Sequence, residues 1–358
     1  MQTTQAFSSE FYSALLPELL LFAGLLALIL IPNLGKGTFR IPGTQIRLPW
    51  LLGGQRFSLT SNPHLPAWIA TITLTGAFVA VADSLNGGVE ALSVVSSDAD
   101  TAKELLMVNG FSRIFELIFF GALALASFAS MNRLKVEGVG GKLTEDQLYN
   151  NRRQADFYIL MLTCGLGMSV VALSQDLFVL FIGLELASFS TYVLVAFLKE
   201  SKAGAEAGMK YFIVGSVASG VGLYGLSMLY LWAGSLQFEV LATAFATSGT
   251  EPLPLIGIGF VLVGFGFKVS AAPFHFAAPD AYAGASSPVA GVLATASKAM
   301  GMVGLIRMLL IVAAPEASEG SAVWLVCLGA LAALTMTWGN LAALPLQPSS
   351  PTLSLLYR

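Results

Sequence analysis

The chain has 358 residues, of which 56 % are hydrophobic and only 11 % are charged, with a net charge of −3 and a mean hydropathy of +0.76. A soluble domain carries about 25 % charged residues, so this chain cannot cover itself with a water-facing surface. The small net charge and the lack of a basic tract exclude nucleic acid as the expected partner. The abundance of Phe and Gly is typical of helices packed together in lipid.

Nine apolar runs are each long enough to cross a bilayer as a helix, which requires about 20 residues. The runs are continuously apolar and lack the alternation of barrel strands, so the sequence predicts an all-α, polytopic transmembrane bundle. Only Ser174–Gln175 separate the fourth run from the fifth, which predicts an antiparallel hairpin. The predicted spans are Ala14–Ile31, Leu65–Ala82, Ile114–Ser130, Phe157–Leu173, Asp176–Phe197, Glu206–Trp232, Leu253–Phe276, Pro288–Ala313 and Ala322–Leu344.

Basic residues between these spans predict the orientation of the chain. With the N-terminus outside, twelve of the 18 lysines and arginines fall in inside segments, and only Lys103 and Arg113 fall in outside segments. Such a bias toward the cytoplasmic side is typical of membrane proteins. No Lys or Arg precedes the first apolar run, so we expect that run to remain as a helix rather than to be cleaved as a signal peptide.

Charged residues inside the predicted spans mark the candidate site, because a charge at the centre of a membrane helix costs about 2.5–3.5 kcal/mol on insertion scales. Glu185 lies close to the middle of the fifth span, and Lys268 and Lys298 lie deep in the seventh and eighth. Burial disfavours a charged ammonium and a nearby carboxylate favours it, so small movements could make either lysine accept or release a proton. We interpret all three residues as functional; a structural ion pair is the alternative for the lysines.

The other charged residues in the spans lie closer to the helix ends. Lys210 follows Glu206 by four residues and is within reach of the cytoplasmic surface, so its own position leaves function and snorkelling open. Arg307 approaches the outer end of the eighth span, where snorkelling is expected. Glu18 and Glu116 begin the first and third spans, and we expect both carboxylates to lie at the level of the headgroups.

Pro273 predicts a break in the seventh span, in the segment KVSAAPFHFAAPD. Proline removes one helical hydrogen bond and clashes with the preceding turn, which leaves carbonyls near Lys268 and Val269 without their usual donors. In a bilayer this is tolerated where protein or water replaces the donors, so we expect a broken helix that lines a hydrated passage. His275 follows the break and is a candidate proton relay, with a packing role as the alternative.

Two further patterns are interpreted as structural. Cys164 and Cys327 are far apart in apolar runs without a CxxC motif, so we expect two small buried residues rather than a metal site or a disulfide. Gly220, Gly222 and Gly225 spell GxGxxG in the middle of an apolar span, where no strand precedes them, so they are interpreted as helix-packing glycines. We therefore expect no cofactor and no metal in this chain.

Three motifs, in this order, resemble the antiporter-like membrane subunits of respiratory complex I, and among these they are most similar to subunit N of NADH-quinone oxidoreductase. The motifs are LSQDLFVLFIGLELASFSTYVLVAFL, EAGMKYFIVGSVASG and GFKVSAAPFHFAAPDAYAGASSPVAGVLATASKA. LLPELLL near the start and WGNLAAL near the end fit the same family. The resemblance covers residues 14–344, and the segment Pro32–His64 is longer than the family pattern would lead us to expect.

The resemblance implies roles for four residues. Glu185 would be the glutamate of the fifth helix, paired with Lys210 of the sixth. Lys268 would be the lysine beside the helix break, and Lys298 would lead toward the exit half-channel. Together they imply a proton-translocating, non-redox membrane subunit of a complex I-like NAD(P)H- or ferredoxin-quinone oxidoreductase. A subunit of a multisubunit cation–proton antiporter and an inactive fragment with a structural role are the alternatives.

The resemblance also implies surroundings for the chain and shows where it departs from the family. We expect other membrane-arm subunits and the bilayer as partners, with quinone, flavin and iron–sulfur clusters held elsewhere in the parent complex. A prokaryotic plasma membrane is the expected location, with a thylakoid or organelle inner membrane as the alternative. The expected division is an N-terminal segment (1–13), an antiporter-like domain (14–344) and a divergent tail (345–358), where the family would continue with more helices. A split, truncated or frame-shifted product is the expected origin of this tail.

Overall fold

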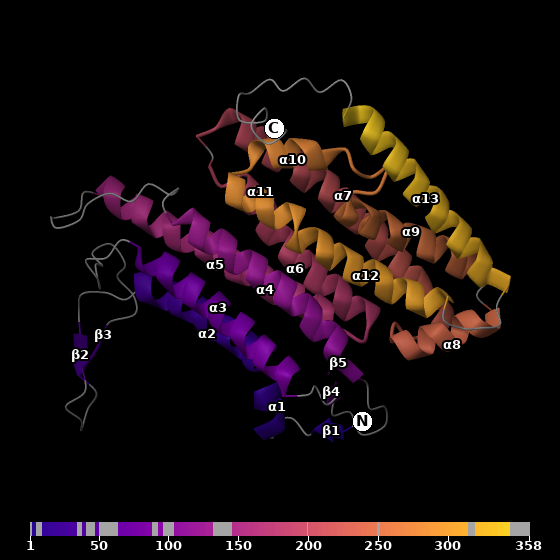
Figure 1. Cartoon of the computed structure of the whole chain (residues 1–358), viewed down its shortest axis with the longest axis horizontal. Helices are drawn as coiled ribbons and strands as arrows, with labels where there is room; N and C mark the ends of the chain where they lie inside the picture. The colour runs from indigo at the N-terminus through magenta and orange to yellow at the C-terminus, as the bar shows by residue number, and fades with distance from the viewer. Residues whose placement is uncertain are drawn as a thin grey trace.

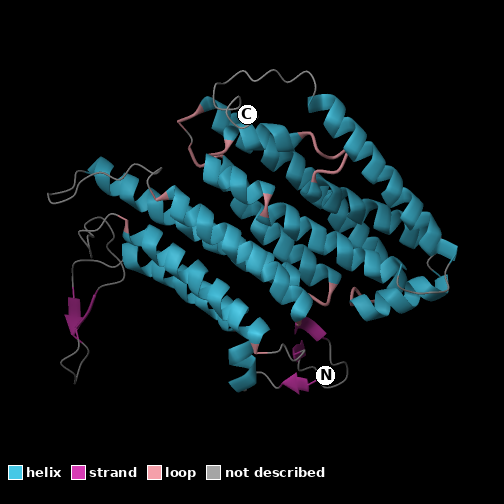
Figure 2. Ribbon diagram, viewed as in Figure 1, coloured by secondary structure: helices cyan, strands magenta, loops and turns pink. Residues whose placement is uncertain are grey.

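The fold is a bundle of long helices with small strands at its periphery (Figures 1 and 2). The computed structural model describes residues 2–4, 9–33, 38–40, 47–49, 64–87, 92–95, 104–131, 145–198, 200–248, 251–313 and 319–343. Its helices are α1 Ser9–Ala14, α2 Leu16–Asn33, α3 Leu65–Asn86, α4 Gly110–Ser130, α5 Glu145–Leu173, α6 Leu177–Val195, α7 Lys202–Ala233, α8 Phe238–Ser248, α9 Pro252–Val269, α10 Ala277–Gly284, α11 Ser287–Ala294, α12 Ala296–Ala313 and α13 Glu319–Ala343. Each predicted span coincides with a helix over most of its length. The divergent tail, 345–358, lies outside the described residues.

Seven helical segments among the described residues are long and apolar enough to cross a membrane. They are α3, α4, the part of α5 from Arg153, α6, α7, α9 and the α11–α12 pair. Shorter apolar stretches are found in α2 (Leu16–Leu30) and α13 (Val326–Ala342). Helices are the expected solution in lipid, because they pair almost all of their backbone groups internally. The prediction of an all-α bundle is confirmed, and the protein is an integral membrane protein.

The short strands, which were not predicted, lie ahead of α1 and in the segments that connect α2 to α3 and α3 to α4. In one sheet β1 pairs parallel with β4, and β4 pairs antiparallel with β5; β2 and β3 form an antiparallel pair. Asn109 directly follows β5 and caps α4, because its side chain accepts a 2.9 Å hydrogen bond from the Ser112 amide. The strands are β1 Gln2–Thr4, β2 Thr38–Arg40, β3 Arg47–Pro49, β4 Leu92–Val95 and β5 Glu104–Val108.

The predicted hairpin between the fourth and fifth spans is confirmed as α5 and α6, which pack against each other. Asp176 ends the connection and caps α6 by accepting hydrogen bonds from the amides of Phe178 (2.8 Å) and Val179 (3.2 Å). The helices approach closely, since a Cβ atom at Gly167 would lie 2.7 Å from the Gly183 carbonyl oxygen. The hairpin brings the middle of α6 into the centre of the bundle.

The helices form successive layers across the molecule (Figure 1). The α2–α3 pair lies along one edge, followed by α4 and α5, and α7, α9 and α13 lie toward the opposite edge. α6 and α12 lie between these groups, while α8 lies near one end of the bundle. Helix α12 contacts α4, α5, α6 and α9, so charged residues on α12 reach the interior from several sides.

Two of the predicted spans are broken. The seventh span was expected to run to Phe276, but α9 ends at Val269 because Ser270 has a left-handed backbone, with φ of 57°. The predicted break near Pro273 is therefore confirmed, and it begins before the proline. The eighth span is divided into α11 and α12 at Thr295, whose φ and ψ are −106° and −80°. No proline or glycine occupies position 295, so the sequence carried no simple signal for this second break.

Candidate functional site

Glu185 lies near the middle of α6, as its position in the span predicts, and its side chain is partly buried. Ser219 of α7 donates a hydrogen bond of 2.5 Å to its Oε1 atom. A hydrogen bond to a carboxylate is charge-assisted and stronger than one between neutral groups. The pair joins α6 to α7 in the apolar centre of the chain.

Lys268 lies in the last turn of α9, with 2 % of its surface exposed. Its Nζ atom has no hydrogen-bond partner among the described residues. It lies 5.3 Å from the centre of the Tyr192 ring, a cation–π contact with a residue two turns beyond Glu185 on α6. The Glu185 carboxylate also attracts the Lys268 ammonium electrostatically. Lys268 is therefore a buried amine beside an aromatic ring and within the field of a carboxylate.

The helix break exchanges one helical hydrogen bond for two tertiary ones. In a continuous helix the Ala272 amide would donate to the Lys268 carbonyl, four residues earlier. Instead, the Ala272 amide donates to Thr335 Oγ1 of α13 at 2.9 Å. The freed Lys268 carbonyl accepts a hydrogen bond of 3.0 Å from Lys298 Nζ. The prediction that carbonyls near Lys268 lose their usual donors is confirmed, and a second lysine is the replacement donor.

Lys298 lies in the first turn of α12 and is partly buried. Besides the Lys268 carbonyl, its Nζ atom donates to the Ser270 hydroxyl, and it lies 5.9 Å from the centre of the Tyr282 ring. The close approach of α12 depends on Gly301, because a Cβ atom there would lie 3.1 Å from that of Lys268. The break thus gathers two lysines, a serine hydroxyl and an open carbonyl at one place.

Lys210 does not form the ion pair with Glu185 that the family resemblance implied. Its Nζ atom lies 2.8 Å from Glu206 and 2.9 Å from Asp280, and about half of its side chain is exposed. The hydrogen-bond donor to Glu185, Ser219, is nine residues further along α7, or about 13 Å along the axis at 1.5 Å per residue. Lys210 therefore joins α7 to α10 at the end of the bundle.

His275 lies in the segment between α9 and α10, next to aromatic side chains. Its ring stacks on Phe276 with centroids 5.3 Å apart and meets the edge of Trp338 at 6.1 Å. Its Nδ1 atom is buried without a hydrogen-bond partner among the described residues. This environment fits the packing alternative, and the relay role stays a prediction.

A second group of buried ionic side chains joins α2, α4 and α5. Arg113 and Glu116 are 1 % and 0 % exposed, and their side chains are 2.6 Å apart. Glu18 lies 3.7 Å from Arg113. Glu116 lies near the start of α4, as expected, but its side chain is enclosed by the bundle, and Arg113 lies within α4 rather than in a connecting loop. The spacing of three residues between Arg113 and Glu116 on a helix was the available signal, since such residues lie on one face.

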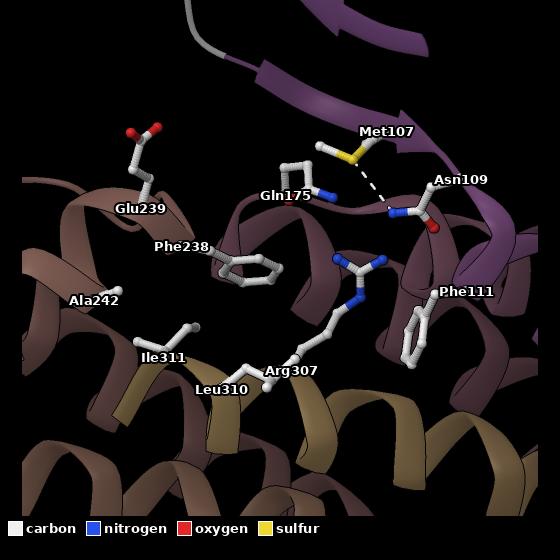
Figure 3. A pocket seen from close by; sticks show the side chains of 10 residues that line it. All are labelled: Met107, Asn109, Phe111, Gln175, Phe238, Glu239, Ala242, Arg307, Leu310 and Ile311. Carbon is white, nitrogen blue, oxygen red and sulfur yellow. Dashed lines mark hydrogen bonds between the residues drawn. The ribbon is translucent and has the colours of Figure 1, made fainter. Parts of the chain in front are cut away.

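Arg307 is also buried rather than snorkelling. It is 6 % exposed, and its guanidinium donates to the carbonyls of Ala172 and Ser174 at the end of α5. The group lies between the rings of Phe111 and Phe238, at 5.3 and 5.6 Å from their centres. It borders a cavity of about 450 Å³ (Figure 3). Carbonyls at a helix end lack intrahelical donors, so Arg307 stays in the bundle as a cap for α5.

The remaining sequence predictions concern cysteines and metals. Cys164 is buried as expected, whereas Cys327 is exposed on α13. Neither is in a disulfide. Within the part of the chain that the structure describes, no three His, Cys, Asp or Glu side chains gather in a way that could hold a metal ion.

Contacts inside the bundle connect α6 to α9 and α9 to α12. Glu185 and Tyr192 of α6 interact with Lys268 of α9, whose carbonyl binds Lys298 of α12. Each link is a charge attraction, a cation–π contact or a hydrogen bond, and all can change with the protonation of a lysine. A site of this kind can accept and release protons within an apolar interior. The chain is thus a polytopic membrane protein in which charged side chains are linked through the interior.

Comparison with known proteins supports this class. Residues 174–347 match the family described as NADH:quinone oxidoreductase/Mrp antiporter, TM. NADH-quinone oxidoreductase subunit N 2 of Roseiflexus castenholzii is 36 % identical over 252 residues, which cover 69 % of this chain and 47 % of the relative. F(420)H(2) dehydrogenase subunit N of Methanosarcina mazei is 32 % identical over 288 residues, or 80 % of this chain and 54 % of the relative. The chain spans about half the length of the curated relatives that it matches.

Solved structures share the fold. A chain of respiratory complex I from Thermus thermophilus matches with a TM-score of 0.64 and 24 % identity, over 92 % of this chain and 59 % of that chain. A chain of the archaeal membrane-bound sulfane sulfur reductase matches with a TM-score of 0.65 and 21 % identity, over 93 % and 59 %. The chain therefore shares its fold with chains of these two membrane complexes. By sequence, residues 174–347 match the NADH:quinone oxidoreductase/Mrp antiporter family, and the chain is similar to N subunits of NADH-quinone oxidoreductases.

Proposed function

We propose that this chain forms the antiporter-like part of a proton-translocating, non-redox membrane subunit in a complex I-like oxidoreductase. The observation that carries the proposal is the buried Nζ atom of Lys268, which has no hydrogen-bond partner among the described residues. It lies over the Tyr192 ring, and the Lys268 carbonyl at the helix break binds Lys298. A buried amine without a hydrogen-bond acceptor is poised to lose a proton, and a neighbouring carboxylate opposes that loss. A change at Glu185 would therefore alter the proton occupancy of Lys268.

In this proposal the Glu185 carboxylate stabilises the positive charge of the Lys268 ammonium. When Lys268 releases a proton, Lys298 receives it. Ser219 holds the Glu185 carboxylate, while Ser270 and the Lys268 carbonyl position the Lys298 ammonium. Each transfer moves one proton from an ammonium to a neutral amine and leaves the number of charges unchanged. Proton transfer between buried groups depends on their separation and orientation, which the break between α9 and α10 sets.

The surroundings of the subunit belong to the same proposal. The relatives are named as subunits of NADH-quinone oxidoreductase and of F(420)H(2) dehydrogenase, which supports other membrane-arm subunits as partners. Flavin, iron–sulfur clusters and quinone would be bound by those partners, with NAD(P)H or reduced ferredoxin as donor. A prokaryotic plasma membrane with the N-terminus outside is the proposed setting.

A subunit of a cation–proton antiporter is the second candidate, because the matching family also includes Mrp antiporters. The same lysines would then exchange protons against another cation, without electron transfer. Purification of the native assembly separates the two candidates. Flavin and iron–sulfur subunits that copurify with the chain support the oxidoreductase, and an assembly without them supports the antiporter.

The substitution Glu185→Gln in the intact complex tests the proposal. It keeps the size of the side chain and removes its charge, so we expect most of the proton translocation per quinone reduced to be lost in sealed vesicles. Glu251→Gln is the matched control, because Glu251 is exposed at the start of α9 and makes no side-chain cap. Translocation that is unchanged in Glu185→Gln would refute the proposal and support a structural role.

A further inference from the structure

The buried ionic group on α2, α4 and α5 lies apart from the lysines of the candidate site. Glu18 is in the first turn of α2, Arg113 and Glu116 are in the first two turns of α4, and Ser169 is near the end of α5. Ser169 and Glu116 are each 0 % exposed, Arg113 is 1 % exposed, and the Glu18 side chain is 16 % exposed. We call these four residues the carboxyl pair cluster.

The charges of the carboxyl pair cluster do not balance if both glutamates are ionised. Arg113 supplies one positive charge against two carboxylates, which leaves one net negative charge in the interior. Leaving a buried charge uncompensated is strongly destabilising. One bound proton brings the net charge of the cluster to zero.

No other described group supplies the missing positive charge. On the helices that pack against the cluster, the ionisable residues at the same end are Asp83 of α3, Arg307 of α12, and Glu10 and Tyr12 of α1. Neither a glutamate nor a tyrosine can supply a positive charge. Asp83 is exposed and would add negative charge. Arg307 donates to the carbonyls at the end of α5, and α11 carries no ionisable residue.

The hydrogen bonds also require one more proton than the ionised side chains carry. Ser169 Oγ lies 2.7 Å from Glu18 Oε1 and 2.8 Å from Glu116 Oε1, and both are hydrogen-bond distances. A serine hydroxyl has one hydrogen, and an ionised carboxylate can only accept. Both contacts are satisfied when one carboxyl is protonated and donates to Ser169, which then donates to the other carboxylate.

The two glutamates differ in how their oxygen atoms are partnered. Both oxygens of Glu116 are bonded, one to Arg113 and one to Ser169. Glu18 Oε2 is buried and has no partner among the described residues. An unpartnered oxygen costs less on a neutral carboxyl than on a carboxylate, so this difference favours Glu18 as the carrier of the proton. Glu18 is also the more exposed member, which gives the proton a route for exchange.

We propose that Glu18 and Glu116 share one exchangeable proton through Ser169, beside Arg113, and so form a proton-binding site separate from Glu185 and the lysines. The site does not require that the chain translocates protons. Because the two carboxyls are coupled through one hydroxyl, the bound proton belongs to the pair. With this proton bound, the cluster is electrically neutral.

Infrared spectroscopy of the full chain in lipid vesicles tests this proposal. A protonated carboxyl has a carbonyl stretch that an ionised carboxylate lacks, and this band shifts on exchange into D₂O. We expect wild-type protein at neutral pH to show such a band from the pair. Glu18→Gln and Glu116→Gln should each abolish it, because the remaining carboxylate then balances Arg113 alone. Ser169→Ala should retain the band and shift it, since the charge count is unchanged and one hydrogen bond is lost.

Two controls make the outcome decisive. Glu239→Gln changes an exposed carboxylate of α8 and should leave the band in place. Glu185→Gln separates the sites, because loss of this band in Glu185→Gln alone would place the proton at Glu185 and overturn the proposal. Unchanged bands in both Glu18→Gln and Glu116→Gln would show that the pair is fully ionised and would also overturn it. If one glutamine variant does not fold, the other and Ser169→Ala give the same decision.

Discussion

The hydrogen bond from the Ala272 amide to Thr335 on α13 is the most direct test of how the helix break is stabilised. Ala272 is 3 % exposed, so its amide cannot turn to water when Thr335 Oγ1 is removed. A buried donor left without a partner costs about 1–3 kcal/mol, which corresponds to roughly a 5- to 150-fold change in the unfolding equilibrium constant. We therefore expect Thr335→Val, which preserves the branched shape, to lower the unfolding free energy by this amount.

The chain offers a matched control two residues further along the same helix. Thr335 and Thr337 both donate to the carbonyl four residues earlier, at 2.7 and 2.8 Å, but only Thr335 also accepts from Ala272. Thr337→Val removes the local bond alone and should have a much smaller effect, and Thr335→Ser should restore most of the stability. The assay is reversible unfolding in mixed micelles, followed by circular dichroism. Equal stability of Thr335→Val and Thr337→Val would refute the reasoning.

Two further predictions concern α7. A Cβ atom at Gly215 would overlap the Tyr192 hydroxyl, whereas a Cβ atom at Gly220 would have none of the described atoms within 4 Å. We therefore expect Gly215→Ala to destabilise the chain by about 1–3 kcal/mol and Gly220→Ala to leave its stability unchanged. A lower melting temperature for Gly220→Ala than for Gly215→Ala would contradict this packing. Lys210 is half exposed, and water and salt screen its ion pairs, so Lys210→Met should leave the unfolding midpoint unchanged at high ionic strength. A large, salt-independent loss of stability would instead indicate a buried role for this lysine.

The class of fold could be predicted from the amino-acid sequence alone. Apolar runs of about 20 residues are a local property, and in lipid they leave helices as the solution for an unbroken backbone. Counting residues along those runs also predicts that Glu185, Lys268 and Lys298 lie inside the bundle, and the structure buries Lys268 fully and the other two in part. The break near Pro273 was also predictable, because proline lacks the amide hydrogen that a helix needs.

Which side chains meet could not be predicted before the helices were placed side by side. Lys210 pairs with Asp280, 70 residues away, and Lys298 donates to the carbonyl of Lys268, 30 residues away. Such pairs depend on how each helix is rotated and which helix lies beside it, and hydropathy along one chain does not encode either. For the same reason a helix-end position did not predict that Glu116 is buried against Arg113. The pattern of apolar residues predicts which segments enter the membrane, whereas the packing of the helices sets which charged side chains contact each other.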